Sequence, residues 1–244
     1  MSVPASVYFD VQQRMIAIME SLDPETFDRR VPACPAWTIR DLLAHVAAGI
    51  SDSASGNVPE LEGVNLMDHW RSIAAHDALE AMLRRQIEQR RAHSVDELLE
   101  EWRTAARHAE PLLRGQQEFP AQVPVFMDWR IAMDITVHED DLRGALGLEP
   151  ADPTLPCYAH AATWYGMALE LRIRDLNRPA VRLEADSVAL DLGDGEPAAV
   201  LRAGAYEMTM ALTGRRTDDE IRALDWDGDP EPFLDIFSSY MSPS

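Results

Sequence analysis

The chain has 244 residues, 46% of them hydrophobic, which is enough for one large or two modest domains with a buried core. Its 42 acidic and 22 basic residues give a formal charge of −20, which argues against a nucleic acid or an anionic membrane as partner. No stretch approaches the ~20 consecutive apolar residues of a membrane span. The first residues lack the pattern of a secretory signal, and Cys34 and Cys157 have no CxxC spacing, so we expect a cytoplasmic protein.

The first segment of the chain has the periodicity of a helix. Apolar residues recur every three to four positions between residues 5 and 22, which predicts an amphipathic helix. Prolines then interrupt the pattern. Thr38, with Asp41 three residues later, resembles a capping box, so a second helix is expected to begin there and to carry His45.

Further helices follow the same pattern. Apolar spacing between residues 70 and 87 predicts a third helix, and Ser94 with Glu97 forms another capping box. The helix that begins there is expected to end before Pro111, because proline breaks the hydrogen-bonding pattern of a helix. A proline-containing loop leads to a helix that carries Asp134. Long helices with short or medium connections predict a bundle.

The composition changes near residue 150. One more helix is expected around residues 158–169, and the alternation of apolar residues across 181–192 predicts half-buried strands. Residues 198–204 predict another strand, followed by a short helix that ends at Gly214. We therefore expect a helical bundle over residues 1–150 and a small mixed α/β domain over residues 151–244.

The segment DWDGDPEP looks like a calcium-binding loop, with acidic residues at alternate positions. An EF-hand loop, however, needs Gly where Pro230 stands and a Glu at its twelfth position. We predict an acidic turn instead of a calcium site.

Asp134 and His138 are four residues apart, so both side chains lie on one face of their predicted helix. That face is otherwise apolar, and unpaired charge in a packed interior is costly. His45 also lies on the inward side of its helix. Two imidazoles and one carboxylate leave an open coordination position, as in catalytic zinc sites. The same spacing is often that of a hydrogen-bonded Asp–His pair, and spacing alone favours this interpretation over a metal site.

Four other residues admit more than one interpretation. Cys34 is either a reactive thiol near this site or a small buried hydrophobe. Asp141, one turn beyond His138, either orients a ligand or is solvated. Arg215 and Arg216 follow a helix stop and interact with its last carbonyls or with solvent, unless one of them grips a substrate carboxylate. The chain has no GxGxxG, GxxxxGK[ST] or GxSxG motif for nucleotide binding or serine hydrolysis.

The motifs VPACPAWTIRDLLAHVAAG, DWRIAMDITVHEDDLRGALG and LTGRR together resemble the mycothiol-dependent maleylpyruvate isomerase family. The resemblance implies a mainly α fold, with an N-terminal DinB-like four-helix bundle and a small C-terminal α/β domain. It also implies a divalent metal, with zinc expected, at the positions that match as His45, Asp134 and His138. The isomerases place Glu where this chain has Asp134, which is one methylene shorter but still able to ligate zinc. The absence of Lys fits a GC-rich, actinobacterial source.

The resemblance further implies an enzyme in which mycothiol, a low-molecular-weight thiol, binds the open metal position. As a metal-bound thiolate it attacks a small electrophile, either isomerising it or forming a thiol conjugate. Arg215 is the candidate for holding a substrate carboxylate. Two alternatives stay open: a hydrolase that uses metal-bound water, and a non-catalytic ligand-binding protein on the same scaffold.

Overall fold

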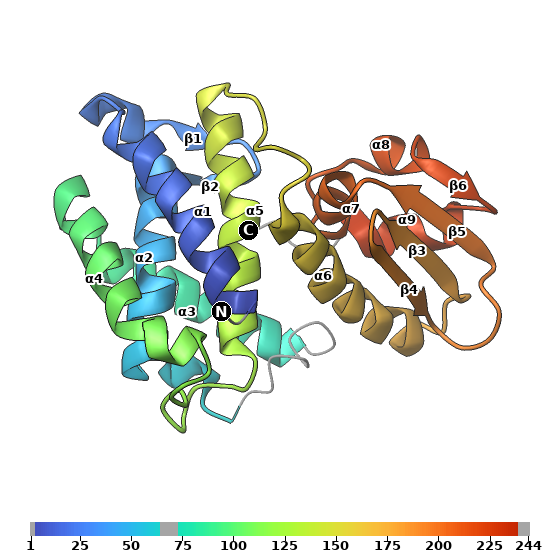
Figure 1. Ribbon diagram of the computed structural model, residues 1–244, viewed down its shortest axis with the longest axis horizontal. Helices are drawn as coiled ribbons and strands as arrows, with labels where there is room; N and C mark the ends of the chain where they lie inside the picture. Colours follow the sequence, from blue (N-terminus) through green and yellow to red (C-terminus); the bar gives the residue numbers. More distant parts are fainter. Residues whose placement is uncertain (1–2, 64–72, 239–244) are drawn as a thin grey trace. The chain divides into compact units, whose positions relative to one another are not determined.

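The computed structural model describes residues 3–63 and 73–238, apart from the side chains of residues 73–76 and 238 (Figure 1). The chain divides into two compact units, one that extends to Glu149 and one that begins at Pro150. None of the described helices is long and apolar enough to cross a membrane.

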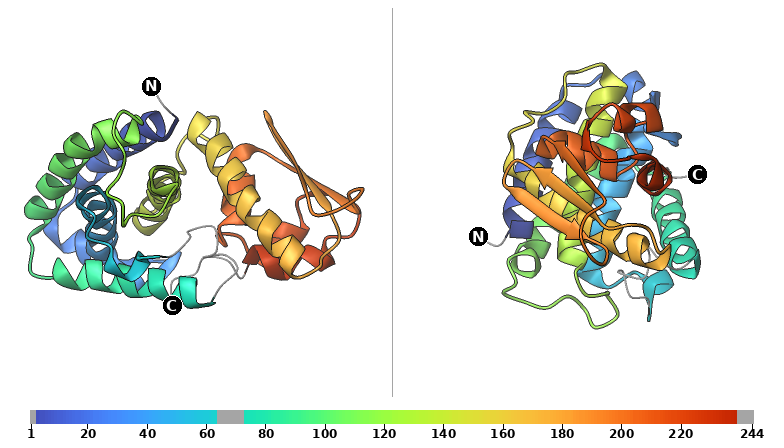
Figure 2. Two further views of the ribbon diagram at one scale, coloured as in Figure 1. Left: turned by 90° about the horizontal axis from the view of Figure 1, so that it is seen from below. Right: turned by 90° about the vertical axis from the view of Figure 1, so that its right-hand side faces the viewer.

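The first unit is almost entirely helical. Its elements in chain order are α1 (Val3–Glu20), η1 (Pro24–Asp28), β1 (Arg30–Val31), β2 (Cys34–Thr38), α2 (Ile39–Ser55), η2 (Pro59–Leu61), α3 (Ile73–Gln89), α4 (Val95–Leu113) and α5 (Met127–Leu146). Helix α1 packs along α5, α2 packs along α4, and α2 also contacts α5 (Figures 1 and 2). These four helices form the predicted bundle, and α3 lies against α2.

Helix α2 begins where the sequence predicts. The Thr38 hydroxyl accepts a hydrogen bond from the Asp41 N–H at 3.1 Å, and the Asp41 carboxylate accepts one from the Thr38 N–H at 2.8 Å. This reciprocal pair satisfies backbone donors that a helix start otherwise leaves free. Most of α2 is buried, including His45.

Two expectations for this unit need correction. The proline-rich segment before α2 is more than an interruption, because β2 pairs antiparallel with β1 and sets Cys34 opposite Val31. Helix α4 does not end before Pro111 but continues to Leu113. Proline lacks an N–H and costs the helix a hydrogen bond. The fully buried Leu113 shows that apolar packing holds this last turn in place.

The second unit combines helices with a four-stranded sheet. Its elements are α6 (Pro156–Asp175), β3 (Val181–Ala185), β4 (Val188–Leu192), β5 (Ala199–Ala203), α7 (Ala205–Leu212), α8 (Asp218–Arg222), β6 (Asp225–Asp227) and α9 (Glu231–Ser238). The strand order is β4-β3-β5-β6, with β3 and β5 parallel and the outer pairs antiparallel. Helix α6 packs on β4 and on α7. The predicted fold class, a helical bundle followed by a small α/β part, is therefore confirmed.

The C-terminal segment again combines a confirmed detail with a correction. Helix α7 ends at Leu212, and Gly214 follows with a φ of 72°, the left-handed conformation that a helix stop favours in glycine. The predicted acidic turn is wrong for Asp225–Asp227, which forms the edge strand β6. Trp226 explains why, because its ring stacks on Phe233 with centroids 5.9 Å apart and its N–H donates to the Ile221 carbonyl.

Candidate metal centre

Three side chains meet between α2 and α5 in the first unit. His45 comes from α2, whereas Asp134 and His138 lie one turn apart on α5. The Nε2 atom of His45 is 2.9 Å from Oδ2 of Asp134, and Nε2 of His138 is 3.8 Å from Oδ1 of the same carboxylate. One donor atom from each residue lies within 4.8 Å of the other two. The structure thus brings together the three residues that the sequence singles out.

The group is largely shielded from solvent. The side chains of His45, Asp134 and His138 are 2%, 15% and 7% exposed. The Trp37 ring, from β2, lies beside both imidazoles, with centroid distances of 4.9 Å to His45 and 5.8 Å to His138. A charge in such surroundings is costly unless it is paired, so the carboxylate needs the positive partners that surround it.

The charges of these groups are strongly coupled. Burial alone raises the pKa of Asp134, but His45, Arg130 and His138 outweigh it and hold that pKa far below its usual range. Burial lowers the pKa of His45 despite its contact with Asp134. Burial opposes protonation of His138 too, yet Asp134 and the hydrogen bond to Asp141 raise its pKa to about 10. The metal-free group is therefore an ionised carboxylate beside one neutral and one protonated imidazole.

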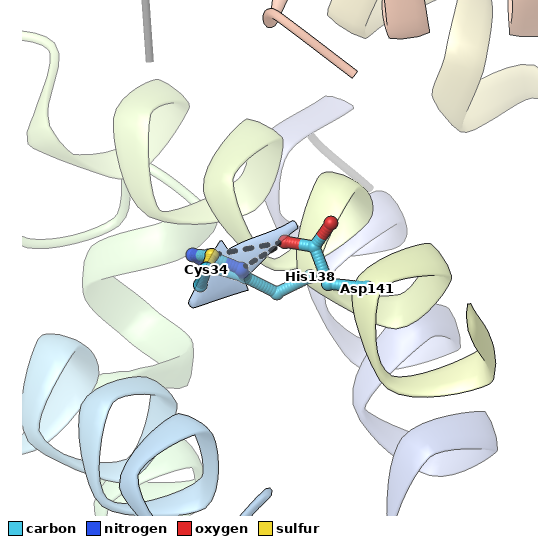
Figure 3. A group of neighbouring side chains, drawn as sticks. All are labelled: Cys34, His138 and Asp141. Atoms are coloured by element: carbon cyan, nitrogen blue, oxygen red, sulfur yellow. Dashed lines mark hydrogen bonds and ion pairs between the residues drawn. The ribbon is translucent and has the colours of Figure 1, made fainter. Parts of the chain in front are cut away.

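A second layer of contacts lies behind His138 (Figure 3). Its Nδ1 atom is 2.8 Å from Oδ2 of Asp141, and the thiol of Cys34 donates to the same oxygen at 3.7 Å. All three side chains are buried. With Nδ1 bonded to Asp141, the Nε2 atom of His138 is left to face Asp134, which is the arrangement found behind metal-ligating histidines. Cys34, His138 and Asp141 form a second potential donor group that shares one imidazole with the first.

The donor atoms suit a small divalent cation. A tetrahedral zinc site with ligand bonds of about 2.0–2.2 Å places its donors roughly 3.3 Å apart. The 2.9 Å and 3.8 Å separations at Asp134 bracket that value. Two imidazoles and one carboxylate leave one coordination position open, as catalytic zinc requires. The residues therefore fit the cation that the sequence predicts.

Arg130 is a neighbour of this group that the sequence interpretation missed. It lies on α5 one turn before Asp134, and its Nη2 atom is 4.0 Å from Oδ1 of that residue. The signal was available, because a spacing of four on a helix places Arg130, Asp134 and His138 on one face.

Arg215, the predicted holder of a substrate carboxylate, lies in the second unit just after α7. Its Nη1 atom donates to the Thr213 carbonyl at 2.7 Å. The adjacent Arg216 forms a bidentate ion pair with Glu207. The Arg215 contact is thus one of the two interactions expected after a helix stop, and its role at a substrate stays a prediction.

The fold and the donor group define a helical-bundle protein with a candidate metal centre inside the bundle. Residues 9–143 match the model of the mycothiol maleylpyruvate isomerase N-terminal domain. The match covers more than half of the chain and includes the whole donor group. The chain therefore belongs to the mycothiol maleylpyruvate isomerase family, which confirms the resemblance found in the sequence and the expectation of an enzyme.

Solved structures extend the comparison to both units. The chain is similar to a crystal structure of the mycothiol-dependent maleylpyruvate isomerase, with a TM-score of 0.55 and 16% identity, and to that of a His-to-Ala variant, with a TM-score of 0.56 and 15% identity. Each comparison covers 87% of this chain and 88% of the other. At this identity they show a shared fold. A search of curated proteins finds no match.

Proposed function

We propose that this enzyme is metal-dependent and uses mycothiol to isomerise a small electrophile or to join it to the thiol. The observation that carries the proposal is the meeting of His45, Asp134 and His138 inside the bundle, within the segment that matches the family. The structural relatives are mycothiol-dependent maleylpyruvate isomerases, which supports a thiol cosubstrate and a small unsaturated acid as the substrate class.

In this proposal His45, Asp134 and His138 hold a divalent cation, with zinc as the first choice for two imidazoles and a carboxylate. When bound, the cation supplies Lewis acidity that lowers the pKa of a thiol reaching the open position. A thiolate is the reactive nucleophile of a thiol, so this shift matches the chemistry that attack on an electrophile needs.

The chain's own residues prepare the site in three ways. Asp141 accepts a hydrogen bond at Nδ1 of His138 and so holds the Nε2 atom toward the other donors. Asp134 stays ionised, ready to act as a ligand. Trp37 packs beside both imidazoles and helps to exclude water, which strengthens electrostatic interactions within the site.

The shorter side chain at position 134 bears on the reaction. Asp134 replaces the Glu of the isomerases that the sequence resembles and reaches one methylene less far from α5. We therefore keep both isomerisation and thiol conjugation within the proposal. A hydrolase using the same residues would turn over without thiol, so the dependence of turnover on mycothiol separates the two chemistries.

The test combines elemental analysis with calorimetric titration of mycothiol before and after chelation. We expect close to one metal ion per chain, and thiol binding that disappears with the metal. His138→Ala should remove both, whereas His108→Ala, which changes an exposed histidine of α4, should remove neither. A wild-type protein that takes up no metal after reconstitution would refute the proposal, as would a His138→Ala variant with unchanged metal content.

A further inference from the structure

Arg130 is a partly buried cation whose guanidinium has no hydrogen-bond acceptor among the residues that the structure describes. Its side chain is 14% exposed, and within the described residues its charge contact is the 4.0 Å approach to Asp134, which is too long for a hydrogen bond. The guanidinium makes no hydrogen bond to any residue in the described part of the chain. Five N–H donors in such a place call for an acceptor.

Other arginines of the first unit show how this fold normally satisfies a guanidinium. Arg143, also on α5, donates to Glu139 at 3.0 and 3.1 Å, and Arg14 grips the same carboxylate at 2.6–3.0 Å. Arg143 and Arg14 are 20% and 27% exposed, so Arg130 is more buried than either and yet more loosely paired. The loose contact is therefore not explained by solvation at the surface.

The guanidinium remains within reach of a ligand. No nitrogen atom of the guanidinium is both fully buried and without a hydrogen-bond partner. It also lies on the helix face that carries Asp134 and His138, one turn from the donor group. An anion bound at Arg130 would thus lie next to whatever occupies the open metal position.

The balance of charge around Asp134 also favours an anion at Arg130. Without a cation, Asp134 offsets the charge of Arg130 at 4.0 Å. A divalent ion that binds Asp134 adds two positive charges beside a single carboxylate charge. The negative charge of Asp134 then no longer offsets the positive charge of Arg130. An incoming anion restores the balance, and its attraction is strong in a site with little water.

We propose that Arg130 is a substrate-binding residue that holds a carboxylate of the electrophile beside the metal donors. A carboxylate is the best match because the planar guanidinium can donate two parallel hydrogen bonds to its two oxygens. This inference rests on the proposed function, which it makes more specific by naming the residue that binds the substrate carboxylate, one turn of α5 from Asp134.

The experiment is calorimetric titration of the zinc-loaded protein with maleate and, separately, with mycothiol. Arg130→Gln should keep its metal and its affinity for mycothiol but bind maleate about tenfold more weakly or worse, the loss expected for a charge-assisted hydrogen bond. Arg130→Lys keeps the charge without the bidentate geometry and should recover part of the affinity. Arg91→Gln makes the same charge change at a side chain that is 73% exposed and should match the wild type.

Three results would overturn the inference: unchanged maleate affinity in Arg130→Gln, a loss of mycothiol affinity in place of maleate affinity, or a loss of bound metal in that variant. The proposed function fails separately, if the wild type takes up no metal. Even then, comparing maleate binding by the metal-free wild type and Arg130→Gln decides whether Arg130 binds the carboxylate.

Discussion

His138 is held from behind by Asp141: its Nδ1 atom lies 2.8 Å from the Asp141 carboxylate, within the same helix and fully inside the bundle. The contact fixes the plane of the imidazole and leaves Nε2 facing Asp134. Cys34, more than one hundred positions earlier in the chain, donates to the same Asp141 oxygen. The orientation of one candidate ligand therefore depends on a carboxylate that does not itself belong to the ligand group.

The first prediction concerns Asp141. Asp141→Asn removes the charge that strengthens the bond to His138, and we expect zinc affinity to fall by about 10–100-fold, as for other residues that support metal-ligating histidines. Competition with a chromophoric chelator measures the change. Asp23→Asn is the matched control, because Asp23 is exposed and its side chain makes no capping hydrogen bond. Equal affinities in the two variants would rule out the supporting role.

The second prediction concerns pH and the metal-free protein. Because the pKa of His138 is raised from 6.5 to about 10 in the fold, its protonation stabilises the folded state below pH 6.5, and this contribution is lost as pH rises through 10. Urea unfolding of chelated protein should show falling stability between pH 6.5 and 10. His138→Gln should lose this part of the pH dependence; a parallel decline in both proteins would contradict the assignment.

The third prediction tests the cysteines. Cys34 and Cys157 are both buried and form no disulfide bond with each other, with exposures of 0% and 6%. A thiol reagent such as dithiobisnitrobenzoate should label neither quickly in the native protein and both after denaturation in urea, because a thiolate must be accessible to react. Rapid native labelling that peptide mapping assigns to Cys34 would instead support the reactive thiol considered from the sequence.

The fourth prediction concerns the two ion pairs of Glu139, one that joins α5 to α1 through Arg14 and one within α5 to Arg143. Glu139 is 1% exposed and accepts hydrogen bonds from both Arg14 and Arg143. Glu139→Gln should lower the free energy of unfolding by about 2–3 kcal/mol, since charge-assisted hydrogen bonds to a buried carboxylate are weakened. Glu88→Gln, at an exposed pair with Arg91, should change it by less than about 1 kcal/mol. Similar values for both in urea unfolding would contradict this account.

The sequence predicts the helices and the inward faces well because both follow from local periodicity and capping. Thr38 and Asp41 mark the start of α2, and four-residue spacing alone places Asp134 and His138 on one side of α5. That His45 would meet them depends on how α2 packs against α5. This pairing is non-local: the inward faces of the two helices make it a hypothesis, and the resemblance to the family independently implies it.

What the sequence missed depends on tertiary context. The strand at Cys34 is short and proline-flanked, so its pairing with β1 leaves little periodic signal, and its contact with Asp141 spans distant segments. The spacing of Arg130 was visible, but the absence of a hydrogen-bond acceptor for its guanidinium within residues 3–63 and 73–238 is a property of the packed structure. Likewise, the acidic segment around Trp226 forms an edge strand that pairs with β5, and the contact of Trp226 with Phe233 holds it there.

The central claim is that His45, Asp134 and His138 bind the metal. The most direct test is a crystal structure of the zinc-loaded protein with anomalous data collected at the zinc edge. We predict one strong peak in the bundle, within about 2.0–2.2 Å of donor atoms of all three residues. A peak held instead by Cys34, His138 and Asp141, or no peak in the bundle, would contradict the account.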